Sequence, residues 1–333
     1  MSPPNVCNNQ IPFFRLGCVA PCSPIESQLT LRRLASVNYR RLIIVVNPAS
    51  GSRQASRVVM EAKPQLESGD TKVVIRETRS RGDAMEIARG VEPGHNDVFV
   101  AVGGDGTVHE VINGVMLRED GRRPPIGVVP AGTGNSVAQD LDVRSTGDAV
   151  ARIACGKTVE LDLMRLGIGE RDLCAFNIVG WGLTALARAT AERLRWLGAW
   201  RCRLASVVEI RRQRYLPVRV VVDGQVLCGQ LPFVLSSNTQ HTARGLKIAP
   251  AARFDDGLVD FLVVKPASRY ALLRLLRSIG SGNHVSSPLV QQYRCREFLI
   301  ESGEAALLNV DGELIRTTRV EAIVRAAALR LIA

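Results

Sequence analysis

The sequence predicts an α/β domain built on a parallel sheet, followed by a second, mainly antiparallel β-sandwich domain. Two observations support this prediction. Between residues 42 and 160, short apolar runs typical of buried strands alternate with amphipathic stretches, a pattern that implies right-handed crossovers between parallel strands. Beyond about Leu161 the chain consists of short β-rich runs separated by turn signals such as Asp223-Gly224 and Asp256-Gly257.

The composition is that of a globular chain. Its 333 residues, 46% hydrophobic and 23% charged, are enough for two domains. The eight cysteines are scattered without a C-x-x-C pair, which argues against a disulfide framework or a zinc site and favours a reducing, cytoplasmic setting. No apolar run reaches the roughly 18 residues that span a bilayer. The net charge of +11 favours an anionic partner, whether a nucleotide, a nucleic acid or an acidic membrane surface.

We divide the chain into three segments. Residues 1–38 contain five prolines and almost no periodicity, so we expect a disordered tail, and their arginines are only a weak sign of an organelle transit peptide. Residues 39–160 form the expected α/β domain, and residues 161–333 form the expected β-sandwich. We leave open a return of the C-terminal segment to the first domain.

In the first domain we expect parallel strands at 42–46, 72–76, 98–102 and 126–129. Helices should follow the first and third strands, because apolar residues recur there at helical spacing. These stripes are Val58, Val59, Ala62 and Leu66, and Val108, Val111, Ile112 and Val115. Asp83 is placed to cap a short helix after the second strand. Two pairs have the spacing of capping boxes, Thr107 with Glu110 and Ser136 with Gln139.

The second domain should contain strands at 173–179, 218–222, 231–235, 258–264, 298–300 and 306–310. Helices are expected around 184–213 and 268–279. The second of these helices carries a leucine-rich stripe beside three arginines, Arg269, Arg274 and Arg277. Core packing and a basic amphipathic surface that faces a membrane are both consistent with this pattern.

The stretch 98–115 is the most informative part of the chain. Its apolar strand stops at Gly103-Gly104-Asp105-Gly106, where glycines let the backbone turn tightly and approach a ligand. The start of the following helix adds N–H groups and a partial positive charge, which suit a phosphate. Asp105 is unusual there, because a carboxylate repels phosphates unless it binds Mg²⁺ or takes a proton. Two further polar loops, 47–52 and 130–136, follow strands at the same sheet edge, where ligands of parallel sheets bind.

Three motifs resemble the nucleotide site of the diacylglycerol kinase catalytic-domain family, which includes diacylglycerol, sphingosine and ceramide kinases. They are Asn47-Pro48-x-Ser50-Gly51, Gly103-Gly104-Asp105-Gly106-Thr107-x-x-Glu110-Val111-x-Asn113-Gly114 and Pro130-x-Gly132-Thr133-Gly134-Asn135. Their order and spacing are specific, and the similarity runs from about 42 to 325. Later stretches are similar to the sphingosine and ceramide kinase branch, among them Trp181-Gly182-Leu183, Arg195-Trp196-Leu197-Gly198 and Asn309-Val310-Asp311-Gly312-Glu313.

The resemblance implies that ATP, with Mg²⁺, binds in a cleft between the two domains. The residues that would line the nucleotide by this match are Asn47, Ser50, Gly51, Thr78, Gly103, Gly104, Gly106, Thr107, Gly132, Thr133, Gly134 and Asn135. Arg195 and Arg201 match two arginines that contact the nucleotide phosphates, and Asp311 matches a further nucleotide contact. Asp105 would be the proton acceptor or the Mg²⁺ partner. Glu313 matches a general base, and the resemblance leaves open which of the two carboxylates takes the proton.

The residue types agree with this chemistry, because phosphoryl transfer needs positioning, Mg²⁺, cations and a base near the attacking hydroxyl. One position departs from the family pattern. In sphingosine kinases an Asp seven residues after the Trp of the W-G pair holds the amine and hydroxyl of the lipid, and here that position is Arg188. A cation repels an ammonium group, so we expect a neutral lipid, diacylglycerol or a ceramide-like molecule.

Several alternatives stay open. They are a sphingoid-base kinase, an NAD kinase-like enzyme that shares the Gly-Gly-Asp-Gly element, and a lipid- or nucleotide-binding protein without catalysis. We expect no nucleic-acid partner, since the basic stretches contain no recognition motif. A cytoplasmic protein that associates peripherally with the membrane carrying its lipid substrate fits the charge best.

Overall fold

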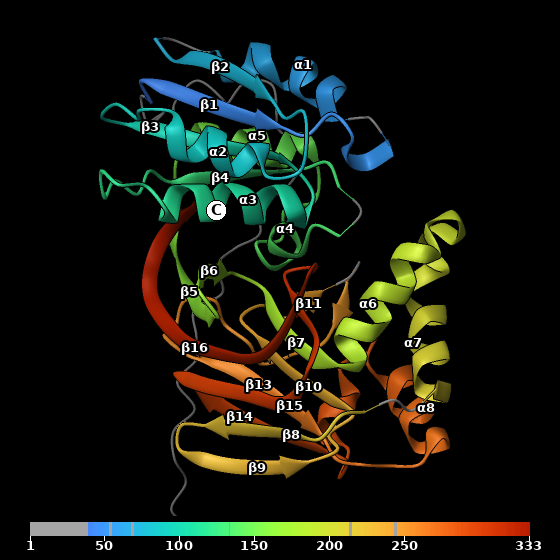
Figure 1. The fold of residues 1–333 in the computed structure, drawn as a ribbon. Coiled ribbons are helices and arrows are strands. Elements are labelled where there is room, and N and C mark those ends of the chain that lie inside the picture. The colour runs from blue at the N-terminus through green and yellow to red at the C-terminus, as the bar shows by residue number, and fades with distance from the viewer. Residues whose placement is uncertain (1–38, 53–54, 68–69, 133, 213–214, 243–244) are drawn as a thin grey trace, which may run out of the picture. The chain divides into compact units, whose positions relative to one another are not determined.

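The structure is a computed structural model that describes residues 39–333 apart from 53–54, 68–69, 133, 213–214 and 243–244 (Figure 1). The expected tail at 1–38 lies outside the described residues. Most strands belong to one sheet of 14 strands, and a separate pair consists of β11 (His241–Thr242) and β12 (Leu246–Lys247).

The first part of the sheet contains four parallel strands in the order β4-β3-β1-β2. They are β1 (Arg41–Val46), β2 (Lys72–Glu77), β3 (Asp97–Gly103) and β4 (Ile126–Pro130). The connecting helices are η1 (Ser50–Ser52), α1 (Ala55–Leu66), α2 (Asp83–Gly90), α3 (Asp105–Met116), α4 (Ser136–Asp140) and α5 (Thr146–Cys155). Each predicted parallel strand is confirmed to within two residues at either end.

Helices cover both faces of these parallel strands (Figure 1). In β1, Ile43 and Val45 pack with α2 and α3, whereas Leu42, Ile44 and Val46 pack with α1 and α5. Successive side chains of a strand point to opposite faces, so a strand buried on both faces needs an unbroken apolar run. This requirement explains why the strands were readable from the sequence.

The second part is mainly antiparallel and sandwich-like. Its strands are β5 (Thr158–Ile168), β6 (Arg171–Ala175), β7 (Ile178–Gly182), β8 (Val218–Val222), β9 (Gln225–Gly229), β10 (Phe233–Ser237), β13 (Val259–Val264), β14 (Val290–Cys295), β15 (Glu297–Val310) and β16 (Glu313–Ile332). Its helices are α6 (Leu183–Arg193), η2 (Arg195–Trp200), α7 (Arg201–Arg212), α8 (Arg269–Ser278) and η3 (Asn283–Ser286). The predicted fold class is thereby confirmed.

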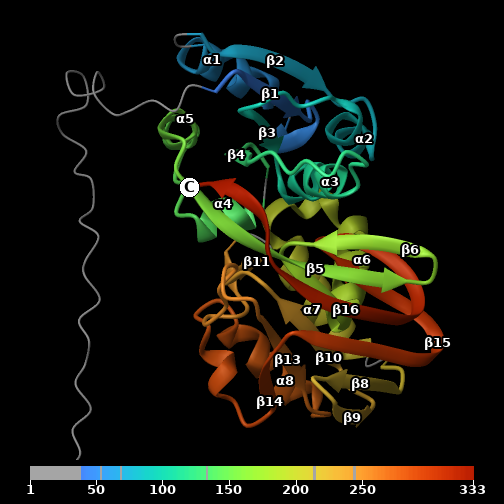
Figure 2. The same cartoon turned by 90° about the vertical axis from the view of Figure 1, so that its left-hand side faces the viewer.

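Strand β16 joins the two parts. It pairs with β15 along residues 313–323 and with β5 along residues 321–332, and Leu331 pairs in parallel with Ile126 of β4. Figure 2 shows this strand running from the β-rich part to β4. The C-terminal segment therefore does return to the parallel sheet, while the exact division into segments at 38 and 160 stays a prediction.

Three local predictions were wrong. The expected strand at 173–179 is two strands, β6 and β7, because the backbone N–H groups of residues 176–178 donate to the carboxylate of Asp311 instead of continuing a strand ladder. The expected strands at 298–300 and 306–310 are one strand, β15, with a register shift between Glu301 and Ala306. Strands β5, β9, β11, β12, β14 and β16 were not predicted.

Neither predicted capping box forms. Helix α3 begins after Gly104 without a side-chain cap, and the carboxylate of Glu110 instead accepts the N–H groups of Gly82 and Ala84 at the start of α2. Asp83 is the first residue of α2 rather than its cap. The amide of Gln139 donates to the carbonyl of Gly134 rather than closing a box with Ser136.

The leucine stripe of α8 belongs to the core. Leu272 and Leu275 are buried, and Leu273 and Leu276 pack against the same cluster together with Ile210 of α7. Of the two interpretations of this helix, core packing is therefore confirmed. The exposed large hydrophobic side chains of this region are Tyr270 at the start of α8 and, near η2, Trp196, Trp200 and Leu204.

Candidate active site

The glycine loops that follow β3 and β4 pack backbone against backbone at the carboxyl edge of the parallel strands. A Cβ atom on Gly132 would lie 2.2 Å from the Cα of Gly104. A Cβ atom on Gly134 would lie 2.3 Å from Oδ2 of Asp105. A side chain at Gly132 would push the two loops apart, and one at Gly134 would displace the carboxylate of Asp105, so both glycines are needed for this packing.

The loop after β1 joins the same cluster. Its own turn is held by Asn47, whose Oδ1 accepts the N–H of Ala49 at 3.0 Å. Gly51 has a φ of 56°, and a Cβ there would lie 2.0 Å from the carbonyl oxygen of Ala131. The structure thus brings the three predicted glycine loops together, as the carboxyl edge of a parallel sheet requires.

Asp105 holds the loops after β3 and β4 together and caps α4. Its Oδ1 accepts the backbone N–H of Ser136 at 2.6 Å, and its Oδ2 accepts the Ser136 hydroxyl at 3.1 Å. Burial raises the pKa of Asp105 to about 6, although the bonds from Ser136 lower it, and the charges of Asp311 and Asp140 raise it further. A carboxyl group with this pKa is mostly ionised at neutral pH and can still take a proton.

Asp311 is fully buried, and both of its oxygens are occupied. They accept the backbone N–H groups of Phe176, Asn177 and Ile178, and Oδ2 lies 2.9 Å from Nδ1 of His109. Burial alone would lower the pKa of His109, but the hydrogen bond and charge of Asp311 outweigh it and raise that pKa. The expected nucleotide contact of Asp311 does not fit this geometry, because no acceptor remains facing a ligand. Its carboxylate instead ties α3 to the β6–β7 junction.

The turn between β15 and β16 carries Glu313 next to Asp311. Oε1 of Glu313 lies 3.0 Å from Nη2 of Arg81, which belongs to the loop between β2 and α2. Arg188 of α6 donates from Nε to the carbonyl of Gly312 at 3.0 Å and also pairs with Glu192. Two cations therefore lie beside the candidate base, one from each part of the chain.

The other predicted residues differ in their surroundings. Thr107 is buried, its Oγ1 has no partner among the described residues, and it packs under Gly103, and its nucleotide contact stays a prediction. Asn135 closes its own loop through two hydrogen bonds with Gly132. Ser50, Thr78 and Arg201 are partly exposed, and Gly106 is exposed. Thr133 and the side chain of Arg195 lie outside the described residues.

Sequence reasoning missed two residues of this region. His109 and Asn113 follow Asp105 at intervals of four, which places the three on one face of α3, and this spacing could have identified them. Asn113 donates to the carbonyl of Cys174 and accepts its N–H, so the same face binds β6. Arg81 gave no comparable signal, because it is an exposed residue in a loop.

Among the residues that the structure describes, no group of three or more His, Cys, Asp or Glu side chains could hold a metal ion. A nucleotide-bound Mg²⁺ does not need such a group, because phosphates and waters supply most of its ligands and the protein adds one or two carboxylates. Asp105, at the point where the glycine loops meet, fits that smaller requirement.

Comparisons with known proteins identify the family. The diacylglycerol kinase catalytic domain matches residues 41–166, and the YegS C-terminal NAD kinase beta sandwich-like domain matches residues 177–333. A diacylglycerol kinase from Staphylococcus carnosus (strain TM300) is 30% identical over 282 residues, which cover 82% of this chain and 89% of the relative. This chain belongs to the diacylglycerol kinase family.

Other relatives of this diacylglycerol kinase family member include sphingosine kinase 1 of Arabidopsis thaliana, 27% identical over 84% of this chain and 69% of the relative. A crystal structure of a diacylglycerol kinase from Bacillus anthracis str. Sterne covers 89% of this chain and 98% of its own, with a TM-score of 0.66 and 20% identity. An NAD kinase from Archaeoglobus fulgidus in complex with ATP has a TM-score of 0.50 and 15% identity, covering 88% of this chain and 93% of its own. The chain is thus a kinase of a lipid kinase family, and the last two likenesses concern its fold.

Proposed function

We propose that this protein transfers the γ-phosphate of ATP to a hydroxyl group of a neutral lipid, diacylglycerol or a ceramide-like molecule. The observation that carries the proposal is the position of Asp105. It lies where the glycine loops meet, with a pKa near neutrality. The turn that carries Glu313 is tied through Asp311 and His109 to the helix that Asp105 begins.

We assign the nucleotide to the three glycine loops. Exposed backbone N–H groups at such loops suit the phosphates, and Gly106 leaves open space where a Cβ would lie. The partly exposed side chains of Ser50 and Thr78 border the same strand ends. Mg²⁺, when bound with ATP, would neutralise the charge that develops on the transferred phosphoryl group, and Asp105 is its proposed carboxylate partner.

The attacking hydroxyl needs a proton acceptor, and the two candidates remain Asp105 and Glu313. Glu313 is partly exposed and is paired with Arg81. Arg81 is largely exposed and can also turn toward phosphate oxygens, which makes it a candidate nucleotide contact alongside Arg195 and Arg201. The nucleotide contacts of Arg195 and Arg201 remain proposals.

The preference for a neutral lipid is supported by Arg188. Its guanidinium binds the carbonyl of Gly312, directly beside Glu313, so a positive charge lies next to the proposed reaction site. Glu192 shares this charge, which weakens the repulsion of an ammonium group without reversing it. A hydroxyl or ester oxygen could instead accept a hydrogen bond from the guanidinium. Sphingoid bases are the alternative substrate class, in line with the names of the Arabidopsis relatives.

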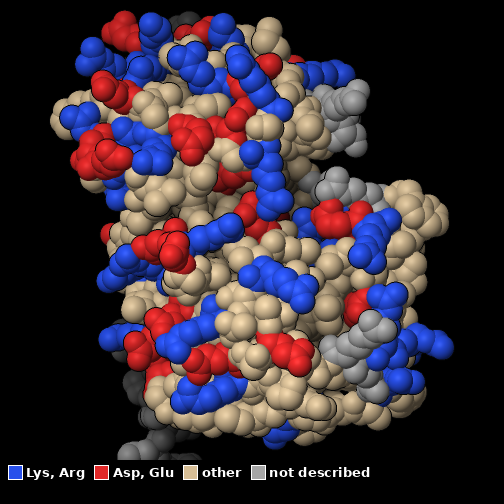
Figure 3. Space-filling view, viewed as in Figure 1, with Lys and Arg blue, Asp and Glu red and all other residues tan. Residues whose placement is uncertain are grey.

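Access to lipid requires contact with a membrane surface, and the η2 region is suited to it. Trp196 and Trp200 are 80% and 68% exposed, next to Arg193 and Arg203 on the adjoining helices. Tryptophan and arginine both favour the boundary between lipid head groups and acyl chains. Figure 3 shows several basic residues on the α6–α7 side of this face, with a few acidic residues among them. In the described part of the chain, no helix has the length and apolarity to cross a bilayer.

The test is a substrate panel. ATP consumption and lipid phosphorylation would be measured with diacylglycerol, ceramide, sphingosine and NAD in mixed micelles, at equal surface concentration for the lipids. We expect diacylglycerol or ceramide to give the highest kcat/KM. A clear preference for sphingosine or NAD would refute the proposed substrate class, and ATP binding without transfer to any acceptor would refute catalysis.

A further inference from the structure

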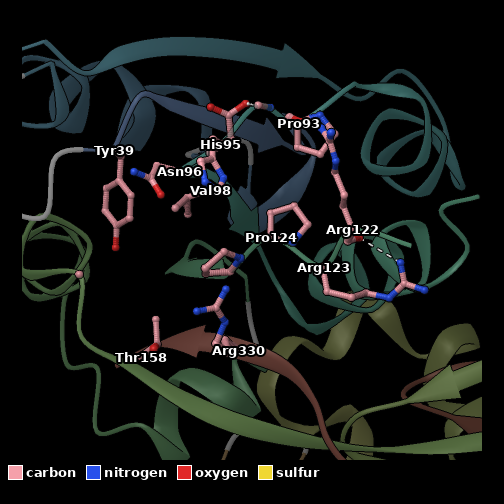
Figure 4. A pocket seen from close by; sticks show the side chains of 14 residues that line it. Tyr39, Pro93, His95, Asn96, Val98, Arg122, Arg123, Pro124, Thr158 and Arg330 are labelled. Carbon is pink, nitrogen blue, oxygen red and sulfur yellow. Dashed lines mark hydrogen bonds between the residues drawn. The ribbon is translucent and has the colours of Figure 1, made fainter. Parts of the chain in front are cut away.

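A cavity lies at the opposite edge of the parallel strands from the glycine loops. It has a volume of about 650 Å³. It lies where β3 begins, before β4 begins and where β5 pairs with the end of β16 (Figure 4). The six steps of β3 from Asp97 to Gly103 cover about 20 Å at roughly 3.3 Å per residue, so this amino-edge pocket is separate from the proposed nucleotide site.

The upper wall of the pocket is a rigid turn. Asp97 accepts the N–H of Gly94 at 2.6 Å, and Asn96 takes a left-handed conformation with a φ of 62°. The charge of Asp97 is matched by Arg41, whose Nη2 lies 2.6 Å from Oδ2. The turn thus presents His95 and Asn96 to the cavity. It also places the carboxylate of Asp97 in the wall, with Oδ2 paired to Arg41 and Oδ1 buried without a partner among the described residues.

Three arginines line the same cavity and make it strongly basic. Arg122 donates to the carbonyl of Pro93, and Arg123 donates to the carbonyl of Met116, so both guanidinium groups are held in place by neutral acceptors. Arg330, near the end of β16, forms neither a hydrogen bond nor an ion pair with any residue that the structure describes. Its cross-strand neighbour Glu160 forms no recorded ion pair with it. Figure 4 shows the Arg330 side chain reaching into the cavity beside Thr158.

Tyr39 adds a buried polar group that lacks a partner. The residue is 7% exposed, and its hydroxyl has no hydrogen-bond partner among the described residues. Figure 4 shows the ring directed toward the region between Asn96 and Thr158. Burial raises the pKa of the Tyr39 hydroxyl, Cys155 raises it further, and the charge of Arg330 lowers it. A buried hydroxyl without a partner costs free energy, and a bound anion would relieve that cost.

We propose that the amino-edge pocket binds the phosphate monoester group of a small organic molecule, with Arg330 as its principal ligand and Tyr39 and Thr158 as hydroxyl donors. A guanidinium has five N–H donors in a planar arrangement that matches two phosphate oxygens. The cavity is in the size range of small-molecule sites and larger than inorganic phosphate alone requires. The phosphate could be carried by a soluble metabolite or by a lipid head group, and the two sources share this recognition chemistry.

Calorimetric titration with glycerol 3-phosphate tests the proposal. The full-length protein would first be saturated with Mg²⁺ and a non-hydrolysable ATP analogue, so that the nucleotide site is occupied. Arg330→Gln should weaken binding by about tenfold or more, as expected for the loss of a charge-assisted hydrogen-bond pair, and Tyr39→Phe should weaken it less. Arg325→Gln is the matched control, because Arg325 and Arg330 are both exposed arginines of β16 but only Arg330 lines the pocket.

Vesicles that contain phosphatidic acid provide a second arm, again comparing Arg330→Gln with Arg325→Gln. Loss of binding in Arg330→Gln with glycerol 3-phosphate supports a soluble ligand, and loss with the vesicles alone supports a lipid head group. Unchanged melting temperature and unchanged ATP turnover in Arg330→Gln would show that this variant is folded. If a folded Arg330→Gln variant matches the control with both probes, the proposal is overturned.

Discussion

At the scale of single residues, Asp105 combines two roles that the sequence alone made hard to reconcile. Its carboxylate caps α4 through Ser136, which explains why an acid is tolerated beside the proposed phosphate-binding loops. Its partial burial and the neighbouring acids keep its pKa near 6, which suits a group that must bind a cation or accept a proton. The structural and chemical roles can be separated by substitution.

Asp105→Asn keeps an oxygen for the Ser136 N–H but removes the charge. We expect kcat to fall by about 100-fold or more, as is typical when a base or metal partner is lost. The thermal stability of this variant should instead increase relative to wild type at neutral pH. A raised pKa means that the folded state holds the proton more tightly, so that stabilisation is complete below pH about 4 and is lost as the pH rises through about 6.

Since Asn does not titrate, the melting temperature of Asp105→Asn relative to wild type should increase between pH 4 and 7. Lipid phosphorylation assays and thermal melts across this range would check both parts. Near-normal turnover in the folded variant would show that Asp105 is not part of the chemistry.

Arg188 offers a residue-scale test of substrate choice. Arg188→Asp should raise kcat/KM for sphingosine relative to diacylglycerol, because an ammonium-binding charge replaces a repelling one. The pairing with Glu192 adds a complication, since the new carboxylate would face a second one at i+4. The double variant Arg188→Asp with Glu192→Gln removes that repulsion and is the cleaner comparison. If neither variant shifts the ratio of kcat/KM values, Arg188 does not contact the head group.

At the scale of elements, the site depends on loops that pack on one another rather than on loops that merely surround a ligand. Gly132→Ala should displace the loops after β3 and β4, because its Cβ would lie 2.2 Å from a backbone carbon. We expect a loss of about 1–3 kcal/mol in unfolding free energy together with a lower kcat/KM for ATP.

Gly106→Ala is the informative counterpart, since nothing lies within 4 Å of its added methyl group. It should leave the melting temperature near that of wild type and change only the KM for ATP. Chemical denaturation and ATP kinetics on the two variants would measure this contrast. Equal stability of the two variants would mean that the loop contacts are not what makes Gly132 necessary.

The η2 segment supports an element-scale prediction about membranes. Replacing both Trp196 and Trp200 with Ala should weaken sedimentation with anionic liposomes by roughly tenfold or more, because two large apolar side chains no longer enter the interface. Soluble ATP binding should be unaffected. Met60→Ala is a suitable control, since this side chain is 66% exposed on α1, far from η2 in the sequence. Liposome binding that is unchanged in the double variant would place the membrane contact elsewhere.

At the scale of the whole molecule, the buried pair of His109 and Asp311 links the parallel sheet to the β-rich part. His109→Gln should destabilise the protein and, by loosening the turn that carries Glu313, lower kcat more than it changes the KM for ATP. The raised pKa of His109 gives the sign of the pH dependence. Its stabilisation is complete below the unfolded pKa of about 6.5 and is lost as the pH rises through the folded value.

The difference in melting temperature between wild type and His109→Gln should therefore shrink from pH 5.5 to pH 9. His95→Gln, an exposed histidine outside this contact, serves as the control. A difference that does not depend on pH would show that His109 acts through packing and not through its charge.

Features that depend on local sequence patterns could be predicted, whereas features that depend on contacts between distant parts of the sequence could not. The parallel strands and the glycine loops were predictable because burial on both faces and tight turns leave local patterns. Strand β16 was not, since few of its residues are fully buried and arginines interrupt its apolar positions. The hydrogen bonds of Asp311 to the β6–β7 junction and to His109 could not be predicted either, because these partners lie 133 to 202 residues away in sequence. The hydrogen bonds from the N–H groups of Gly82 and Ala84 to the carboxylate of Glu110, which replace the predicted capping box, are likewise tertiary contacts.

The path of β16 has a consequence for how the chain reaches its native state. The pairing of Leu331 with Ile126 means that β4 gains its second neighbour only from a segment about 200 residues later. Contacts of such long sequence separation slow folding, because a large loop must close first. During synthesis this edge of β4 would therefore stay unpaired until β16 has been made, and an unpaired strand edge is prone to aggregation. Expressing residues 39–166 alone should yield poorly soluble protein, and adding residues 313–332 in trans is the natural rescue experiment.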